Sequence, residues 1–153
     1  SAHTVLHKDF LPIFKDFIKL TGVKKGDFGI EVTETAELNN LSLASLRLSS
    51  IKNLGVSIAL DDFGAGYSAL RYLKDLPIDL LKLDKSFTTE MAETHNQSLI
   101  QIAKLMADSL SMEFICEGLE EEWQIEKAIS LGCERGQGYF LHKPCSLEDL
   151  TNE

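Results

Sequence analysis

Residues 56–66 read VSIALDDFGAG, and this stretch decides the fold class. The apolar run at its start predicts a buried strand. Asp61 and Asp62 follow the run directly, and Gly64 and Gly66 permit backbone conformations in the next loop that other residues avoid. Acidic residues at a strand end in an α/β barrel face the functional rim. The stretch therefore predicts a strand that delivers two carboxylates to a site, followed by a loop that can move with the site.

Similar apolar, β-prone runs recur along the chain with starts 24 to 33 residues apart, and helical patterns of period 3.6 lie between them. Each interval has room for one strand, one helix and two loops, which predicts an α/β fold with a parallel sheet or a (β/α) TIM-like barrel. The predicted strands are 28–33, 56–60, 80–83, 113–116 and 138–141. The predicted helices are 8–20, 41–53, 97–110 and a short closing helix at 146–152.

A complete (β/α) barrel has eight strands and about 250 residues. The 153 residues here supply about five strands, so we expect one truncated domain that lacks its N-terminal strands. Strands cut from a closed barrel leave two exposed edges, and exposed edges invite pairing with another chain. We therefore expect self-association, most simply as a homodimer.

The composition is that of an ordinary globular chain, with 44% hydrophobic and 25% charged residues. A net charge of −9 argues against binding long nucleic acids through a basic patch, although a divalent cation could still recruit a small anionic ligand. Cys116, Cys133 and Cys145 are odd in number and lack CxxC spacing, which predicts reduced thiols. Neither a run of membrane-spanning length nor a signal peptide is recognised, so we expect a cytoplasmic segment without membrane contact.

Acidic side chains close several of the predicted strands. Because the carboxyl ends of successive parallel strands converge at one barrel mouth, these carboxylates would repel each other without a cation between them. Oxygen ligands without histidine or thiolate suit Mg²⁺ or Mn²⁺, and two such ions about 4 Å apart can clamp a phosphodiester and activate water. The strand-end acids are Glu31, Glu34, Asp61, Asp62, Asp84, Glu117 and Glu120.

Lys82 lies within the third predicted strand, beside this acidic cluster. A lysine there can polarise an attacking water or neutralise charge that develops on a phosphate. The alternative is a structural ion pair with Asp61 or Asp84, and the sequence leaves both interpretations open.

Five motifs, in order and at matching spacing, resemble the EAL domain, a family of cyclic di-GMP phosphodiesterases. The resemblance covers essentially the whole chain and identifies residues 1–153 as the C-terminal part of a single EAL domain. The motifs are IEVTE at 30–34, DDFGAGYSAL at 61–70, LKLD at 81–84, CEGLE at 116–120 and QGYF at 137–140.

The resemblance implies hydrolysis of cyclic di-GMP to linear pGpG with two Mg²⁺ or Mn²⁺ ions. The implied metal ligands are Glu31, Asp61, Asp62 and Glu117, and the implied catalytic residues are Lys82, Glu117 and Asp61. Gln137 would lie in the same pocket; the alternative is that it caps a helix or bonds to backbone groups. The implied supports of the loop or the substrate are Glu34, Glu120, Gln137, Asp84, Phe63, Gly64 and Gly66.

Two features of the family are not among the 153 residues: the Glu-Ala-Leu sequence and a metal-binding asparagine. Both supply metal ligands in the family, so we expect these residues alone to be inactive, whereas the complete parent would be a hydrolase. The alternative is a non-catalytic cyclic di-GMP sensor or protein-interaction module with an EAL-like fold. The two missing ligands would decide between these functions.

Overall fold

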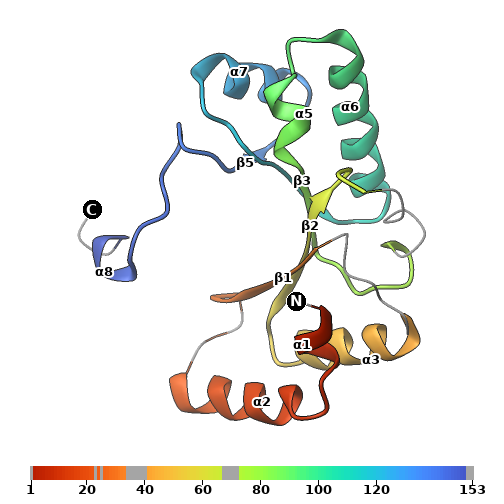
Figure 1. Ribbon diagram of the computed structural model, residues 1–153, viewed down its shortest axis with the longest axis vertical. Helices are drawn as coiled ribbons and strands as arrows, with labels where there is room; N and C mark the ends of the chain where they lie inside the picture. Colours follow the sequence, from red (N-terminus) through yellow and green to blue (C-terminus); the bar gives the residue numbers. More distant parts are fainter. Residues whose placement is uncertain (1, 23, 25, 34–40, 67–72, 151–153) are drawn as a thin grey trace.

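The computed structural model describes residues 2–22, 24, 26–33, 41–66 and 73–150 (Figure 1). Its centre is one five-stranded sheet in which every neighbouring pair is parallel and the strand order follows the chain. The predicted α/β fold with about five parallel strands is therefore confirmed. The strands are β1 (Gly29–Thr33), β2 (Ser57–Phe63), β3 (Leu80–Leu83), β4 (Glu113–Cys116) and β5 (Arg135–Gly136).

The helices divide between the two ends of the sheet. Figure 1 shows α1, α2 and α3 beside β1 and β2, and α5, α6 and α7 around β3, β4 and β5. The four helices predicted from periodicity correspond to α2, α3, α6 and α8, whereas α1, α5 and α7 had no assigned range. The bounds are α1 (Ala2–Leu6), α2 (Phe10–Thr21), α3 (Leu41–Lys52), α5 (Lys85–Thr89), α6 (Thr94–Ser109), α7 (Glu122–Ser130) and α8 (Leu147–Leu150).

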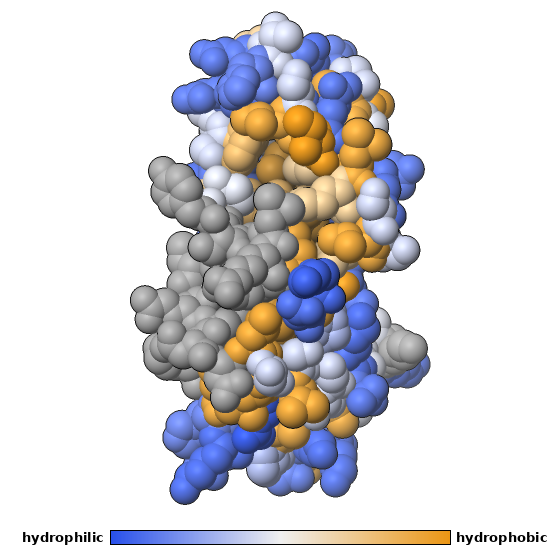
Figure 2. All heavy atoms as spheres, turned by 90° about the vertical axis from the view of Figure 1, so that its right-hand side faces the viewer, coloured by the Kyte–Doolittle hydropathy of each residue, from blue (hydrophilic) through white to orange (hydrophobic). Residues whose placement is uncertain are grey.

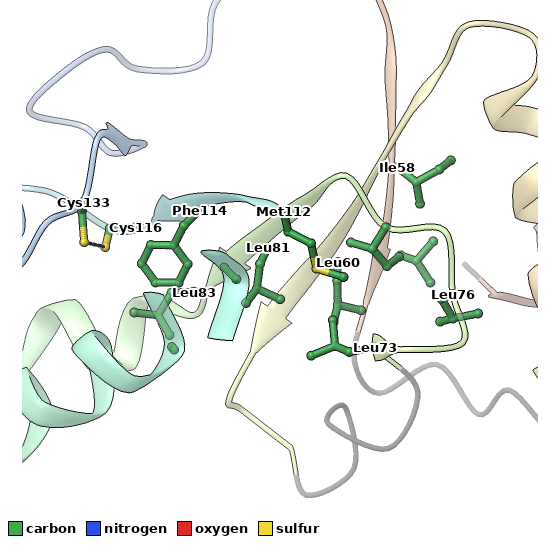
Figure 3. Packing of buried hydrophobic residues seen from close by; sticks show 14 of the residues in the cluster. Ile58, Leu60, Leu73, Leu76, Leu81, Leu83, Met112, Phe114, Cys116 and Cys133 are labelled. Atoms are coloured by element: carbon green, nitrogen blue, oxygen red, sulfur yellow. Dashed lines mark hydrogen bonds between the residues drawn. The ribbon is translucent and has the colours of Figure 1, made fainter. Parts of the chain in front are cut away.

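The core lies along the middle of the sheet, where β2 and β3 are buried on both faces as parallel strands usually are, whereas β5 is exposed. Leu60 of β2 pairs with Leu81 of β3, and Ile58 and Phe114 continue the same cluster on either side of them (Figure 3). Cys116 and Cys133 close its far end as free, buried thiols whose sulfur atoms are 3.1 Å apart. Both cysteines are therefore part of the packed core.

The prediction of the fifth strand is wrong. Residues 138–141 form a turn, and the fifth strand is β5, which ends before them. The amide of Phe140 donates to the Leu119 carbonyl at 3.0 Å, and the amide of His142 donates back to the Gly138 carbonyl at 3.0 Å. Gly138 lies so close to the Leu119 backbone that a Cβ atom would overlap it. The turn therefore needs a glycine, which the apolar pattern of the segment does not reveal.

The surface carries apolar side chains between hydrophilic ends on the face shown in Figure 2. Helices α3 and α6 lie on that side of the molecule, and Leu46, Ile102 and Leu105 are among their exposed residues. Within the described part of the chain, no helix has both the length and the apolar character that a membrane crossing requires.

Candidate active site

The carboxyl ends of neighbouring strands bring the predicted acidic residues together. Glu31 pairs with Ala59 in the β1–β2 register, so Asp61 lies two residues further along the adjacent strand. Lys82 pairs with Ile115 of β4, and Glu117 directly follows that strand. Four strands that run in one direction thus bring one lysine and several carboxylates together at the carboxyl ends of the strands.

Lys82 is the centre of this arrangement. Its Nζ atom lies 2.7 Å from Glu31 Oε1, 2.9 Å from Asp61 Oδ1 and 2.5 Å from Glu117 Oε1. An ammonium group has three protons, so each carboxylate can receive one hydrogen bond. The Lys82 side chain is only 5% exposed, whereas that of Glu31 is 54% exposed. The lysine is therefore a buried cation with one partner on each of three neighbouring strands.

These partners decide the protonation state of Lys82. Burial by itself would lower the lysine pKa, but the hydrogen bonds that Lys82 donates to Glu117, Glu31 and Asp61 outweigh burial and raise the pKa above its usual value. Lys82 is consequently a cation at neutral pH and can donate hydrogen bonds, but it cannot accept a proton from water. Lys82 forms the ion pair with Asp61 that the structural interpretation expected, and it does so beside the acidic group, where the catalytic interpretation placed it. The two interpretations are therefore compatible.

Asp62 points its carboxylate into the same region through an unusual backbone. Its φ is 56°, in the left-handed region that aspartate tolerates better than most residues. The β2–β3 register also shifts between Leu60 and Phe63. A regular strand would turn consecutive side chains to opposite faces, and the irregularity lets Asp61 and Asp62 approach the same point. Burial, followed by repulsion from Asp61 and Asp84, raises the Asp62 pKa.

Glu117 completes the acidic group. Its side chain is 15% exposed, and burial raises its pKa although the adjacent Lys82 opposes the shift. One carboxylate oxygen from each of Asp61, Asp62 and Glu117 lies within 4.8 Å of the other two. Glu31 is outside that group, although it shares the contact with Lys82 that Asp61 and Glu117 make.

These donors fit a hard divalent cation. The group offers carboxylate oxygens without nitrogen or sulfur, which suits Mg²⁺ or Mn²⁺. Burial and repulsion between the carboxylates raise the pKa values of Asp62 and Glu117, which means that their charged forms are disfavoured here. A bound cation would offset that cost, because it attracts the negative charges. The arrangement can therefore hold a metal ion beside a fixed ammonium group.

The remaining predicted residues of the β2 and β3 ends surround the acidic group. Asp84 caps α5, because its Oδ1 accepts the Ser86 amide at 3.0 Å and the Ser86 hydroxyl at 2.5 Å. Phe63 packs half-buried against the core, and its carbonyl accepts the Asp84 amide. Gly64 has φ 94°, and Gly66 lies half-buried in the bend that follows.

A groove of about 800 Å³ opens beside Glu117. Glu120 and Gln137 both line it, and Lys85 and Lys143 add positive charge. The Gln137 backbone bonds to Cys116 and Leu119, while its side chain belongs to the groove lining. The groove is large enough for a small organic ligand next to the acidic group.

One predicted site residue, Glu34, lies outside the residues that the structure describes, and two buried residues near Glu117 were not predicted from the sequence. Thr88 and Gln124 are buried polar residues that contact the backbone around Glu117, and neither was predicted. The Glu121-to-Gln124 spacing of a capping box could have pointed to Gln124, but the sequence contains no comparable signal for Thr88.

Comparison with known proteins places this site in context. The EAL domain family model matches residues 1–144. The signaling protein YkoW of Bacillus subtilis is 38% identical over 152 residues, covering 98% of this chain and 19% of that protein. The cyclic di-GMP phosphodiesterase PdeA of Borreliella burgdorferi is 32% identical over 145 residues, covering 94% of this chain and 22% of that protein.

A similar solved structure is the PaMucR phosphodiesterase in complex with c-di-GMP, and MucR is a protein of Pseudomonas aeruginosa. The TM-score is 0.89 at 30% identity, over 98% of this chain and 61% of that one. The chain thus spans about a fifth of the curated relatives named above and less than two thirds of this solved structure.

Proposed function

The chain belongs to the EAL domain family, and we propose that its site hydrolyses one phosphodiester bond of cyclic di-GMP to give linear pGpG. The observation that carries this proposal is the buried Lys82 ammonium, held by carboxylates from three strands next to the Asp61, Asp62 and Glu117 group. The phosphodiesterase relatives and the c-di-GMP complex of PaMucR support the choice of reaction and substrate.

We propose Asp61, Asp62 and Glu117 as ligands of Mg²⁺ or Mn²⁺, with Glu31 as a further ligand if its carboxylate leaves Lys82. When bound, such an ion supplies positive charge that attracts the phosphodiester and lowers the pKa of water. The family expectation of two ions, and of further ligands outside these 153 residues, belongs to the same proposal.

The residues of this chain have distinct proposed roles in the reaction. Water attacks phosphorus, one phosphorus–oxygen bond breaks, and the leaving 3′ oxygen gains a proton. Lys82 stays protonated, so its role is to orient the three carboxylates through its hydrogen bonds and to stabilise negative charge on the phosphate through its own positive charge. Glu117, whose pKa is raised by burial, is the candidate acceptor of the water proton.

The groove beside Glu117 supports a dinucleotide substrate. Only one phosphate of cyclic di-GMP would lie at the acidic group, so the rest of the dinucleotide needs space beside it. The groove next to Glu117 provides about 800 Å³. Lys85 and Lys143 on its lining offset the negative charge of the carboxylates. We propose that Glu120, Gln137 and the loop that begins at Gly64 support the bound nucleotide.

Turnover by the intact protein tests this function. We expect conversion of cyclic di-GMP to pGpG in Mg²⁺ or Mn²⁺, measured by chromatography, and loss of turnover in Glu117→Gln. Glu113→Gln is the matched control, because Glu113 lies at the other end of β4 and pairs with Arg135. Tight nucleotide binding without turnover would instead support the non-catalytic sensor.

Three narrower proposals concern the 153 residues themselves. We propose that they do not turn over cyclic di-GMP alone, since they lack the Glu-Ala-Leu sequence and the asparagine that the family resemblance calls for. We propose that they self-associate through exposed strand edges. We also propose a cytoplasmic location, which the three free cysteines support.

A further inference from the structure

A pair of buried polar side chains holds the segment that carries Glu117. Thr88 of α5 is 0% exposed and Gln124 of α7 is 6% exposed. Both direct polar atoms at the backbone between 117 and 121 and not at the carboxylates of the acidic group. Buried polar groups persist only where hydrogen bonds satisfy them, so these contacts are specific features of the fold.

Thr88 contacts the candidate ligand residue directly. Its hydroxyl lies 2.5 Å from the Glu117 carbonyl oxygen and 2.9 Å from the Lys85 carbonyl oxygen. A hydroxyl has a single proton, and the shorter distance favours donation to Glu117. Asp84 is two residues after Lys82, and helix α5 begins at the next residue. Thr88 therefore connects the strand that supplies the ammonium group to the segment that supplies Glu117.

Gln124 holds the other end of the same segment. Its Oε1 accepts the amides of Glu120 at 2.7 Å and Glu121 at 2.9 Å, and its Nε2 donates to the Thr88 carbonyl at 3.1 Å. One carboxamide thus joins α7, α5 and the segment after β4. Because it accepts from two backbone amides and donates to a third group, it fixes the segment in position as well as in orientation.

The packing between these elements leaves no room for a side chain at position 118. Gly118 has φ 68°, and a Cβ atom there would lie 2.5 Å from the Lys85 Cβ and 3.2 Å from the Thr88 hydroxyl. The segment after β4 is therefore pressed against α5 at the residue that follows Glu117.

We propose that Thr88 and Gln124 are positioning residues that set the Glu117 carboxylate against Lys82, Asp61 and Asp62. The proposal rests on the proposed function only in expecting a metal ion at that carboxylate. Groups that orient metal ligands typically change metal affinity about 10- to 100-fold when they are removed. The placement of Glu117 beside Lys82 can be measured without any metal.

Three threonine variants test the proposal in the intact protein. Thr88→Val keeps the shape but removes the hydroxyl, and Thr88→Ser restores it. Thr89→Val is the matched control, because the exposed Thr89 hydroxyl bonds to the same Lys85 carbonyl, at 2.9 Å, and not to the Glu117 carbonyl. We expect Thr88→Val to weaken Mn²⁺ binding about 10-fold by calorimetry and to shift the Lys82 Nζ resonance in the metal-free protein. Thr88→Ser and Thr89→Val should leave both unchanged.

The two readouts separate this proposal from the proposed function. A Thr88→Val protein with unchanged Mn²⁺ affinity and an unchanged Lys82 resonance overturns the proposal, even if its melting temperature falls. A shifted Lys82 resonance in a protein that binds no Mn²⁺ even as wild type supports the positioning role and contradicts the metal-dependent function. If Thr88→Val does not fold, Gln124→Met is measured in its place, with the same two outcomes deciding.

Discussion

Lys82 shows how a single side chain can hold an acidic site together before any ligand arrives. Three carboxylates meet at its ammonium group, and the lysine is almost fully buried. A buried charge is costly unless it is paired and hydrogen-bonded, and here each proton has a partner. The same contacts that stabilise the fold keep the lysine protonated, so its structural and proposed catalytic roles have one physical cause.

Lys82→Met should damage both stability and turnover. Without the ammonium group, Asp61 and Glu117 face each other uncompensated, and we expect the metal-free protein to lose about 2–3 kcal/mol in urea denaturation. In the intact protein, kcat should fall about 100-fold, because a donor to developing charge acts mainly in the transition state. Lys104→Met is the control, since Lys104 pairs with Asp108 on α6. An unchanged kcat with a raised KM would make Lys82 a binding residue.

Asp62→Asn separates metal binding from folding. Burial and the neighbouring Asp61 and Asp84 raise the Asp62 pKa, so its charged form is less favourable in the folded protein than in the unfolded chain. A neutral side chain removes that penalty, and asparagine tolerates φ 56°. We expect an equal or higher melting temperature at pH 7 together with Mn²⁺ binding at least about 10-fold weaker. A large loss of stability would mean that the carboxylate bears a structural contact.

At the scale of the elements, the short helix α5 organises more of the site than its length suggests. It spans only Lys85–Thr89, between the strand of Lys82 and helix α6. Asp84 caps its start, Thr88 reaches the Glu117 carbonyl, and Phe87 covers Gly64 at the end of β2. Five residues therefore contact the ends of β2, β3 and β4, which carry all the candidate catalytic residues.

The contact between α5 and the β2 end predicts the effect of Gly64→Ala. A Cβ atom at Gly64 would lie 2.5 Å from the Phe87 ring, and φ is 94°. Gly132 has φ 87° with nothing within 4 Å of its Cβ position, so Gly132→Ala measures backbone strain alone. We expect Gly132→Ala to cost about 1 kcal/mol in urea denaturation and Gly64→Ala to cost clearly more. Equal costs would mean that Phe87 moves aside freely.

At the scale of the whole molecule, the sheet is open. Its order runs from β1 to β5, so in the described part of the chain these two strands have a neighbour on one side only. The edge at β5 is only two residues long, whereas β1 has five residues. Unpaired amides and carbonyls on an exposed edge are available to another chain. The longer β1 edge is therefore the better candidate for pairing.

We expect the isolated 153 residues to form a dimer through β1 at micromolar concentration, as measured by sedimentation equilibrium. Ile102→Lys is the control, because Ile102 is 62% exposed on α6 and a dimer through the sheet edge should tolerate a charge there. Dissociation of the dimer by this variant would place the interface on the helices. A compact monomer at all concentrations would contradict self-association.

The sequence by itself determined the fold class, four of the five strands and the residues of the acidic group. Apolar runs alternating with helical periods leave few arrangements other than a parallel sheet. Parallel strands carry their carboxyl ends to one edge, so Glu31, Asp61 and Glu117 could be expected to meet at Lys82. Their individual roles in the reaction remain predictions.

Only the tertiary structure decided the fifth strand, the cap formed by Asp84 and the hydrogen bonds of Thr88 and Gln124. The local pattern at 138–141 favours a strand, but close contact of Gly138 with the Leu119 backbone makes it a turn. Thr88 and Gln124 lie 36 residues apart in the chain and meet only because α5 and α7 pack together. Local sequence determines backbone preference and periodicity, whereas such contacts depend on which distant segments the packed sheet brings within hydrogen-bond distance.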